Sequence, residues 1–159
     1  MKPAESNEAG FQSIESNKKA YFNYEILEKL EVGIVLTGCE VKSIRAGHIT
    51  IRDSFARVVT KELWLFNCTI QPYTYGNRHN PDPVRNRKLL IHRAQLAKWE
   101  AKVSQKGLVL VPVSIYFKHG KVKLSIGLGK PKKLHDKRQS LKEKSTKREL
   151  DRAIRNYQK

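Results

Sequence analysis

Apolar and polar residues alternate along much of the chain between residues 21 and 128, with the period of two that turns one face of a β-strand toward a core. Two pairs of runs are joined by short turns, at Lys61-Glu62 and at His119-Gly120, and therefore predict antiparallel hairpins. Trp64 and Phe66 supply aromatic residues for cross-strand pairs in the first hairpin. The expected strands cover residues 21–36, 49–51, 55–60, 63–70, 108–117 and 122–128.

Two other segments place their apolar residues at helical spacing. The first is short and lies between Gly38 and Gly47, with its apolar residues on one face and its basic residues on the other. The second covers residues 89–105 and ends before Gly107, a residue type that commonly follows the last helical turn.

The segments between and before these elements differ in character. Residues 1–16 are rich in Ser, Glu and Asn, and we expect them to be disordered. Residues 71–87 contain three prolines and form a long loop that carries Arg78, Arg85 and Arg87. Loops of this length in compact domains are usually functional or mobile.

The order of these elements predicts a mainly β domain over residues 17–129. Local antiparallel connections favour a small, closed or nearly closed barrel of the oligonucleotide-binding (OB) type, with two or three short peripheral helices, because closure removes unpaired strand edges. An open α+β sandwich is the alternative fold. The length of 159 residues suits one such domain and a single core.

The carboxyl end of the chain differs from the rest in its charge. Residues 130–159 contain twelve Lys or Arg against four Asp or Glu and form a basic tail, while the whole chain has a net charge of +17. So polar a segment is not expected to bury enough apolar surface to stay ordered alone. A basic tail on a basic body indicates a polyanionic partner, and RNA is the one we expect. A membrane surface is not expected, because the tail lacks the aromatic and leucine-rich face of interfacial helices.

Known catalytic patterns are missing from the sequence. It contains no Walker loop, no G-x-G-x-x-G and no G-x-S-x-G elbow, so we do not expect an enzyme or a cofactor. Cys39 and Cys68 form no C-x-x-C and have no histidine at metal-ligand spacing, which favours two reduced thiols and no metal. No signal peptide or membrane span is visible, so a cytoplasmic protein is expected. Nothing in the sequence indicates an oligomer, so we expect a monomer.

Several blocks of sequence, in a fixed order, carry a resemblance to a known family. They are Asn17-Lys18-Lys19-Ala20, the run EVGIVLTGCEVKSIRAG from Glu31 to Gly47, Arg87-Lys88-Leu89-Leu90, and Gly129 to Arg138 ending in HDKR. From about Asn17 onward the chain resembles SmpB, the SsrA-binding protein family. The resemblance implies an OB-like barrel that binds the tRNA-like domain of tmRNA in place of an anticodon arm. It also implies delivery to stalled ribosomes with elongation factor Tu as an indirect partner.

The resemblance also implies which residues contact tmRNA. The family's RNA-binding positions fall on Asn17, Glu31 and Leu90. Glu31 would accept hydrogen bonds from base edges or 2′-hydroxyls, and its alternative is an exposed strand residue or an internal salt bridge. Leu90 would pack on a base or sugar, and its alternative is a place in the core. Candidate phosphate contacts are Lys18, Lys19, Lys42, Arg45, Arg87 and Lys88.

For the tail, the resemblance implies a helix that forms in the decoding centre and empty mRNA channel, against small-subunit rRNA. The tail residues expected at the ribosome are Lys132, Lys133, His135, Asp136, Lys137, Arg138 and Ile154. Arg155 follows Ile154 where some members have an apolar residue, which argues against a purely hydrophobic role for that pair. A charged tail that only keeps the protein in solution is the alternative.

Two other functions fit parts of the sequence. A general OB-type RNA-binding or accessory ribosomal protein would share the charge, but it should carry stacking aromatics on the barrel face. Here most aromatics fall at alternating positions that are expected to face the core. An RNA-processing enzyme ranks last, because no catalytic arrangement accompanies the basic residues.

Overall fold

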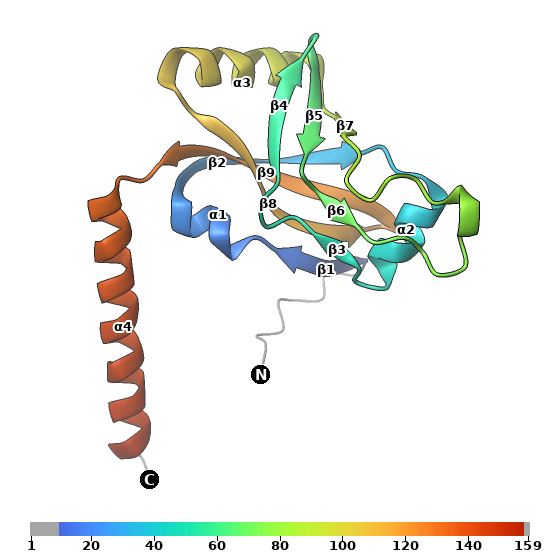
Figure 1. Cartoon of the computed structure of the whole chain (residues 1–159). Coiled ribbons are helices and arrows are strands. Elements are labelled where there is room, and N and C mark those ends of the chain that lie inside the picture. The colour runs from blue at the N-terminus through green and yellow to red at the C-terminus, as the bar shows by residue number, and fades with distance from the viewer. Residues whose placement is uncertain (1–9, 158–159) are drawn as a thin grey trace.

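The computed structural model describes residues 10–157 and consists mainly of β-sheet with four helices around it (Figure 1). The strands are β1 (Phe11–Ser16), β2 (Tyr24–Ile34), β3 (Ile49–Thr50), β4 (Phe55–Val59), β5 (Glu62–Phe66), β6 (Thr69–Ile70), β7 (Arg87–Leu90), β8 (Val109–Lys118) and β9 (Lys121–Pro131). The helices are α1 (Lys18–Asn23), α2 (Gly38–Arg45), α3 (Arg93–Lys106) and α4 (Leu134–Tyr157), with a 3₁₀ turn η1 (Asn77–His79).

Seven strands form one antiparallel sheet in the order β1-β8-β4-β5-β7-β2-β9, and β3 pairs with β6 separately. β8 also pairs with β9, so the pairings that run from β8 through β4, β5, β7, β2 and β9 return to β8. β9 passes very close to its neighbours. A Cβ at Gly127 would lie 2.8 Å from Cγ2 of Val113 and 2.9 Å from Cγ2 of Ile26, which only glycine avoids.

The core lies inside this strand arrangement and under two helices. Inward-facing aliphatic residues of β2, β5, β7, β8 and β9 are almost completely buried. Leu96 and Trp99 of α3 and Ile44 of α2 extend the core beneath the helices. In Figure 1, α3 lies beside the β4–β5 hairpin, α2 lies at the opposite side of the body, and α4 projects away from it.

Both predicted hairpins are present, as β4–β5 and β8–β9. The short helix predicted after Gly38 is α2, and Thr37 begins it with a capping box. The Thr37 hydroxyl accepts from the backbone N–H of Glu40, and the Glu40 carboxylate accepts from the backbone N–H of Thr37. This cap fixes Glu40 at the first turn of α2, where its side chain is buried.

Several predicted boundaries were wrong. Residues 21–23, predicted as strand, end the helix α1, and the strand predicted over residues 63–70 is divided into β5 and β6. Residues 11–16 form β1, paired with β8, so disorder to residue 16 is contradicted there, and residues 1–9 lie outside the described residues. Residues 89 and 90 belong to β7, and the helix expected from residue 89 begins at Arg93. The tail was predicted to start at residue 130, to be disordered alone and to become helical on the ribosome. β9 extends into it as far as Pro131, and α4 follows from Leu134, where lysines, glutamates and arginines favour helix.

Arg87 was predicted to contact phosphate, and the structure places it elsewhere. Its side chain is completely buried, and its Nε donates to Oε1 of Glu40 at 2.8 Å. Its other nitrogens donate to the backbone carbonyls of Cys68, Arg85 and Pro83. Arg87 therefore cannot reach RNA and instead ties β7 and the loop before it to α2.

Arg85 completes this cluster by donating to both carboxylate oxygens of Glu40. Burial alone would raise the pKa of Glu40, but hydrogen bonds from Arg85, the Thr37 backbone and Arg87 outweigh it and hold the pKa below its ordinary value. The cluster therefore stabilises the fold above the unfolded-state pKa of the carboxyl, and this contribution is lost as the pH falls through the lower folded-state pKa.

We expect Arg87→Ala to lower the free energy of unfolding by about 3–5 kcal/mol, because it leaves the Glu40 charge buried with one partner removed. The neighbouring Lys88 pairs with Glu62 while both side chains are half-exposed, so Lys88→Ala should cost at most about 1 kcal/mol. Urea unfolding of the two variants checks this. Similar losses for both variants would contradict the role given to Arg87.

Candidate functional site

Two of the predicted RNA-binding residues, Glu31 and Leu90, lie in the same surface hollow. The hollow has a volume of about 350 Å³ and is formed where β2, β7 and β9 run side by side. β2 brings Glu31 and Gly33, β7 brings Leu90, and β9 brings Lys123. The full lining is Glu31, Gly33, Leu90, Ile91, His92, Gln95 and Lys123. We call it the Glu31–Leu90 hollow.

The Glu31 carboxylate is held from one side by groups of the β8–β9 hairpin. The Tyr116 hydroxyl donates to Oε2 at 2.7 Å, and Lys118 Nζ donates to the same oxygen at 3.1 Å. Lys123 Nζ lies 4.0 Å from Oε1. The Tyr116 ring is itself buried and packs against Phe11 at 4.8 Å between ring centroids.

These contacts settle the charge state of Glu31. The hydrogen bond from Tyr116, followed by that from Lys118, outweighs burial and lowers the pKa of Glu31, while burial and the same carboxylate raise the pKa of Tyr116. Glu31 is therefore ionised at neutral pH. The internal salt bridge that was its alternative role is formed, yet the Glu31 side chain remains 36% exposed and can still accept from a ligand.

Leu90 is an exposed apolar residue that lines three adjoining hollows. Its side chain is 53% exposed, so the alternative of a place in the core is wrong. Gly33 makes room for it, because a Cβ at Gly33 would lie only 3.2 Å from Leu90 Cβ. Leu90 also borders two neighbouring hollows, one with Lys88 and Arg93 and one with Lys121 and Lys123.

Asn17 lies away from this hollow and is buried. Its Oδ1 accepts from the backbone N–H of Ala20 as the cap of α1, and its amide donates to the carbonyls of Ile51 and Pro112 at 3.0 Å each. This placement contradicts a direct RNA contact by Asn17. The residue fixes α1, whose exposed Lys18 and Lys19 follow it, and Lys19 pairs with Asp53.

Lys42 and Arg45 are exposed on α2 and form a third group. Lys42 Nζ lies 5.5 Å from the centroid of the Tyr73 ring, and the Arg45 guanidinium lies 5.5 Å from that of Phe117. Apart from the buried Arg87, the predicted RNA-binding residues of the body therefore lie at three places: α1, α2 and the hollow. Among residues distant in the sequence, the structure brings together Glu31 and Leu90, and Lys88 lies beside Leu90 in a neighbouring hollow.

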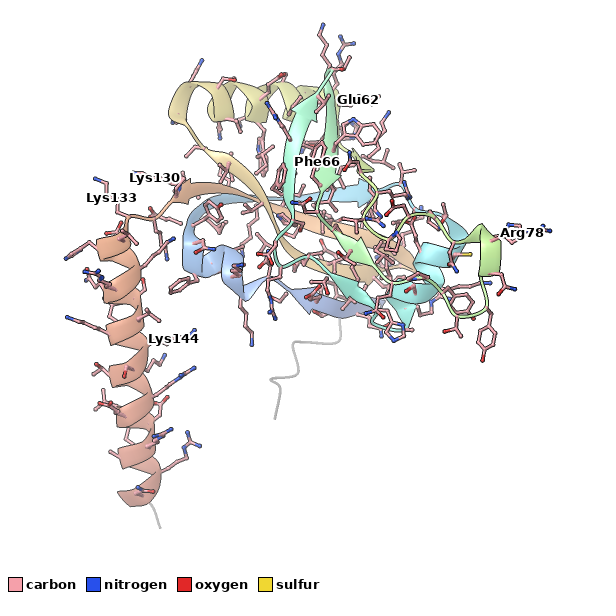
Figure 2. All side chains as sticks on the ribbon, viewed as in Figure 1. Glu62, Phe66, Arg78, Lys130, Lys133 and Lys144 are labelled. Atoms are coloured by element: carbon pink, nitrogen blue, oxygen red, sulfur yellow. The ribbon has the colours of Figure 1, made fainter. Side chains whose placement is uncertain are left out.

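The base of the tail is tied to α1. The backbone N–H of Lys132 donates to the Asn23 carbonyl and its Nζ donates to the Tyr21 carbonyl. Asp136, in the first turn of α4, accepts from the backbone N–H of Lys133 at 3.1 Å, which is the half of a capping box that an acidic residue supplies. Figure 2 shows the side chains of α4 pointing into open space on several sides, with Lys133 near its start and Lys144 further along.

Most of the predicted tail residues are exposed. His135, Arg138 and Ile154 are exposed on α4, and Lys137 is half-buried. Within residues 10–157, no helix is both long enough and apolar enough to cross a membrane.

The sequence is similar to known proteins over almost the whole chain. The family model described as SmpB protein matches residues 14–156. This chain belongs to the SmpB family. The resemblance found in the sequence is thereby confirmed.

Curated relatives in the SmpB family are similar over nearly their full length. The SsrA-binding protein of Syntrophotalea carbinolica is 54% identical over 146 residues, which are 92% of this chain and 97% of the relative. The SsrA-binding protein of Bacillus velezensis is 51% identical over 92% of this chain and 94% of the relative. A solved structure described as tmRNA-SmpB and the centre of the bacterial ribosome is 48% identical, with a TM-score of 0.64, covering 77% of this chain and 86% of that chain.

Sequence reasoning missed the partners of Glu31 in this SmpB-family chain. Tyr116, Lys118 and Lys123 belong to a hairpin that was predicted, but the register of that hairpin against β2 was not. The register places Lys123 opposite Gly33, two residues from Glu31, and no local pattern in the sequence specifies it. A tyrosine and two lysines beside one glutamate were therefore visible only in the structure.

We expect Tyr116→Phe to raise the pKa of Glu31 toward its ordinary value, because the change removes the largest stabilising hydrogen bond and keeps the ring. A carbon-13 NMR titration of the Glu31 carboxyl measures the shift. Tyr24→Phe makes the same chemical change on β2 and should leave the titration unchanged. An unaltered Glu31 pKa in Tyr116→Phe would show that the hydroxyl does not hold the carboxylate.

Proposed function

We propose that this chain binds the tRNA-like domain of tmRNA and brings it to stalled ribosomes for trans-translation, with α4 entering the decoding centre and the empty mRNA channel. The observation that carries the proposal is the similarity over nine-tenths of the chain to proteins named for binding SsrA. The structural neighbour, described by tmRNA, SmpB and the ribosome together, supports the same partners.

In this proposal the body is an OB-like barrel. The circuit of strand pairings from β8 round to β9 and back to β8 supports closure. A rigid barrel suits structured RNA, which proteins recognise largely by shape, phosphates and 2′-hydroxyls rather than by base sequence. None of these roles involves catalysis, in keeping with an RNA-binding family.

The Glu31–Leu90 hollow is where we place the contact with tmRNA. Glu31 is an ionised acceptor held in a fixed position, suited to base edges or 2′-hydroxyls that donate. Leu90 offers an exposed apolar surface next to it for a sugar or a base face. Lys88, Lys118 and Lys123 border the two residues and would meet phosphates.

α4 suits a role in a channel lined by RNA. Its 24 residues extend about 36 Å from the body. Its basic side chains project on several sides, and its apolar residues, such as Leu141 and Ile154, are more than half exposed. The helix therefore presents charge to phosphates along its length and leaves apolar groups to be covered in a complex. Small-subunit rRNA would be its partner, and elongation factor Tu would meet the complex through tmRNA.

We expect Glu31→Ala to weaken binding of the tRNA-like domain about 10- to 100-fold while the fold stays intact, since hydrogen bonds to a charged group contribute about 1.5–3 kcal/mol each. Titration of labelled RNA by fluorescence anisotropy measures this. Glu28→Ala is the matched control, because Glu28 lies on the same strand and is exposed, and it pairs with Lys102 outside the hollow. Equal affinities for wild type and Glu31→Ala would remove Glu31 from the interface.

We expect a chain that ends after Lys133 to bind the tRNA-like domain normally and to fail in tagging peptides on stalled ribosomes. The shortened chain keeps all of β9, whose last residue, Pro131, pairs with Tyr24 of β2. It lacks the whole of α4. A reconstituted translation assay on a message without a stop codon supplies the readout. Full tagging by the shortened chain would overturn the role of α4.

A further inference from the structure

The loop between β6 and β7 has no part in the hollow or in α4. We propose that this loop carries a second RNA contact, a stacking platform in which the ring of Tyr75 receives an unpaired base and nearby cations hold the adjoining phosphates. The platform rests on the proposed function only in taking RNA as the partner. None of the residues lining the Glu31–Leu90 hollow comes from the loop.

Tyr75 is the most exposed large apolar or aromatic side chain among the described residues, at 81%. The Tyr73 ring lies edge to face with the Tyr75 ring, with 5.6 Å between centroids. Leu134, at the start of α4, is the next most exposed, at 75%. The faces of a ring this exposed are available to a flat ligand.

The loop that presents Tyr75 is held in one conformation by its own hydrogen bonds. The Asn80 side chain accepts from the Tyr73 backbone N–H and donates to the Tyr73 carbonyl, both at 2.9 Å. The backbone N–H of Gly76 donates to the same carbonyl at 2.8 Å. A Cβ at Gly76 would lie 2.6 Å from the Asn80 amide oxygen, so a side chain here would displace the amide that ties the turn.

Both ends of the loop are anchored to α2 or to the residues beside it. Ser43 Oγ donates to the Gln71 carbonyl at 2.6 Å, and at the other end Arg85 is paired with Glu40. The loop is long, but these hydrogen bonds and this ion pair hold it in place. A ring exposed on a pinned loop loses little conformational entropy on binding, which is the condition for an effective stacking surface.

Basic side chains lie near Tyr75, and Asp82 is the exposed carboxylate in the same loop. Lys42 lies over the Tyr73 ring, and Arg78 and His79 follow Tyr75 in the exposed η1 turn. Figure 2 shows Arg78 at the tip of the loop, on the side of the body opposite α4. The nearby carboxylate of Glu40 is buried and already paired with two arginines.

Aromatic rings bordered by cations are how proteins bind single-stranded RNA with little regard to base identity. The unpaired segments of a folded RNA present such bases, whereas its helices do not. The platform would therefore bind a single unpaired base, whereas the hollow would recognise the shape of a structured RNA domain.

The test compares the affinities of the full-length wild type, Tyr75→Ser and Tyr75→Phe for full-length tmRNA and for an oligoadenylate of twelve nucleotides. Tyr75→Ser should bind at least one of these RNAs about 5- to 150-fold more weakly, the loss expected of one base–aromatic stack. Tyr75→Phe keeps the ring and should bind like wild type. Tyr21→Ser, which removes an exposed tyrosine from α1, is the matched control and should change neither affinity.

Salt dependence separates stacking from charge. Tyr75→Ser should leave the slope of log affinity against log salt unchanged, whereas Lys42→Ala should reduce it by about one. Wild-type affinity of Tyr75→Ser for both RNAs overturns the platform, as does an equal loss in Tyr75→Phe. Wild type that does not bind tmRNA overturns the proposed function instead, and the oligoadenylate series then decides the platform alone.

Discussion

The buried ion cluster of Glu40, Arg85 and Arg87 is the interaction on which the placement of the surface depends. Glu40 is fixed by the capping box at the start of α2. It pairs with Arg85 at the end of the loop between β6 and β7 and with Arg87, the first residue of β7. β7 begins at Arg87, so the same contact sets where Leu90 emerges beside β2. Loss of the cluster would release the loop and shift one wall of the Glu31–Leu90 hollow.

Asn17 is a second buried polar residue that joins separate elements of the body. Asn17 caps α1 and bridges to the backbone of Ile51 and of β8. Asn17 and Arg87 both belong to the blocks that the chain has in common with the SmpB family, and both act through the fold rather than by touching RNA. In the proposed function, the direct contacts are made by exposed residues that these two position.

The strands with clean alternation could be predicted from the sequence, because a period of two and a short turn leave few alternatives. β1 was missed, since FQSIES is mostly polar and its order comes from pairing with β8. Leu89 and Leu90 fit a helix as well as a strand until their pairing with β5 and β2 is known. The partners of Glu31 and the burial of Arg87 depend on register and on long-range contacts, which local patterns do not encode. Glu31 and Leu90 themselves were predicted from the resemblance.

In the proposed function, the many basic groups supply affinity, and a few fixed groups in the Glu31–Leu90 hollow supply discrimination between RNAs. The measurement that tests this most directly is a competition assay at physiological salt, in which labelled tRNA-like domain of tmRNA is bound to the full chain and challenged with excess ordinary tRNA or unstructured RNA. The account predicts that the labelled domain stays bound. Equal displacement by any RNA, with binding that collapses as salt rises, would show a non-specific polyanion binder and contradict it.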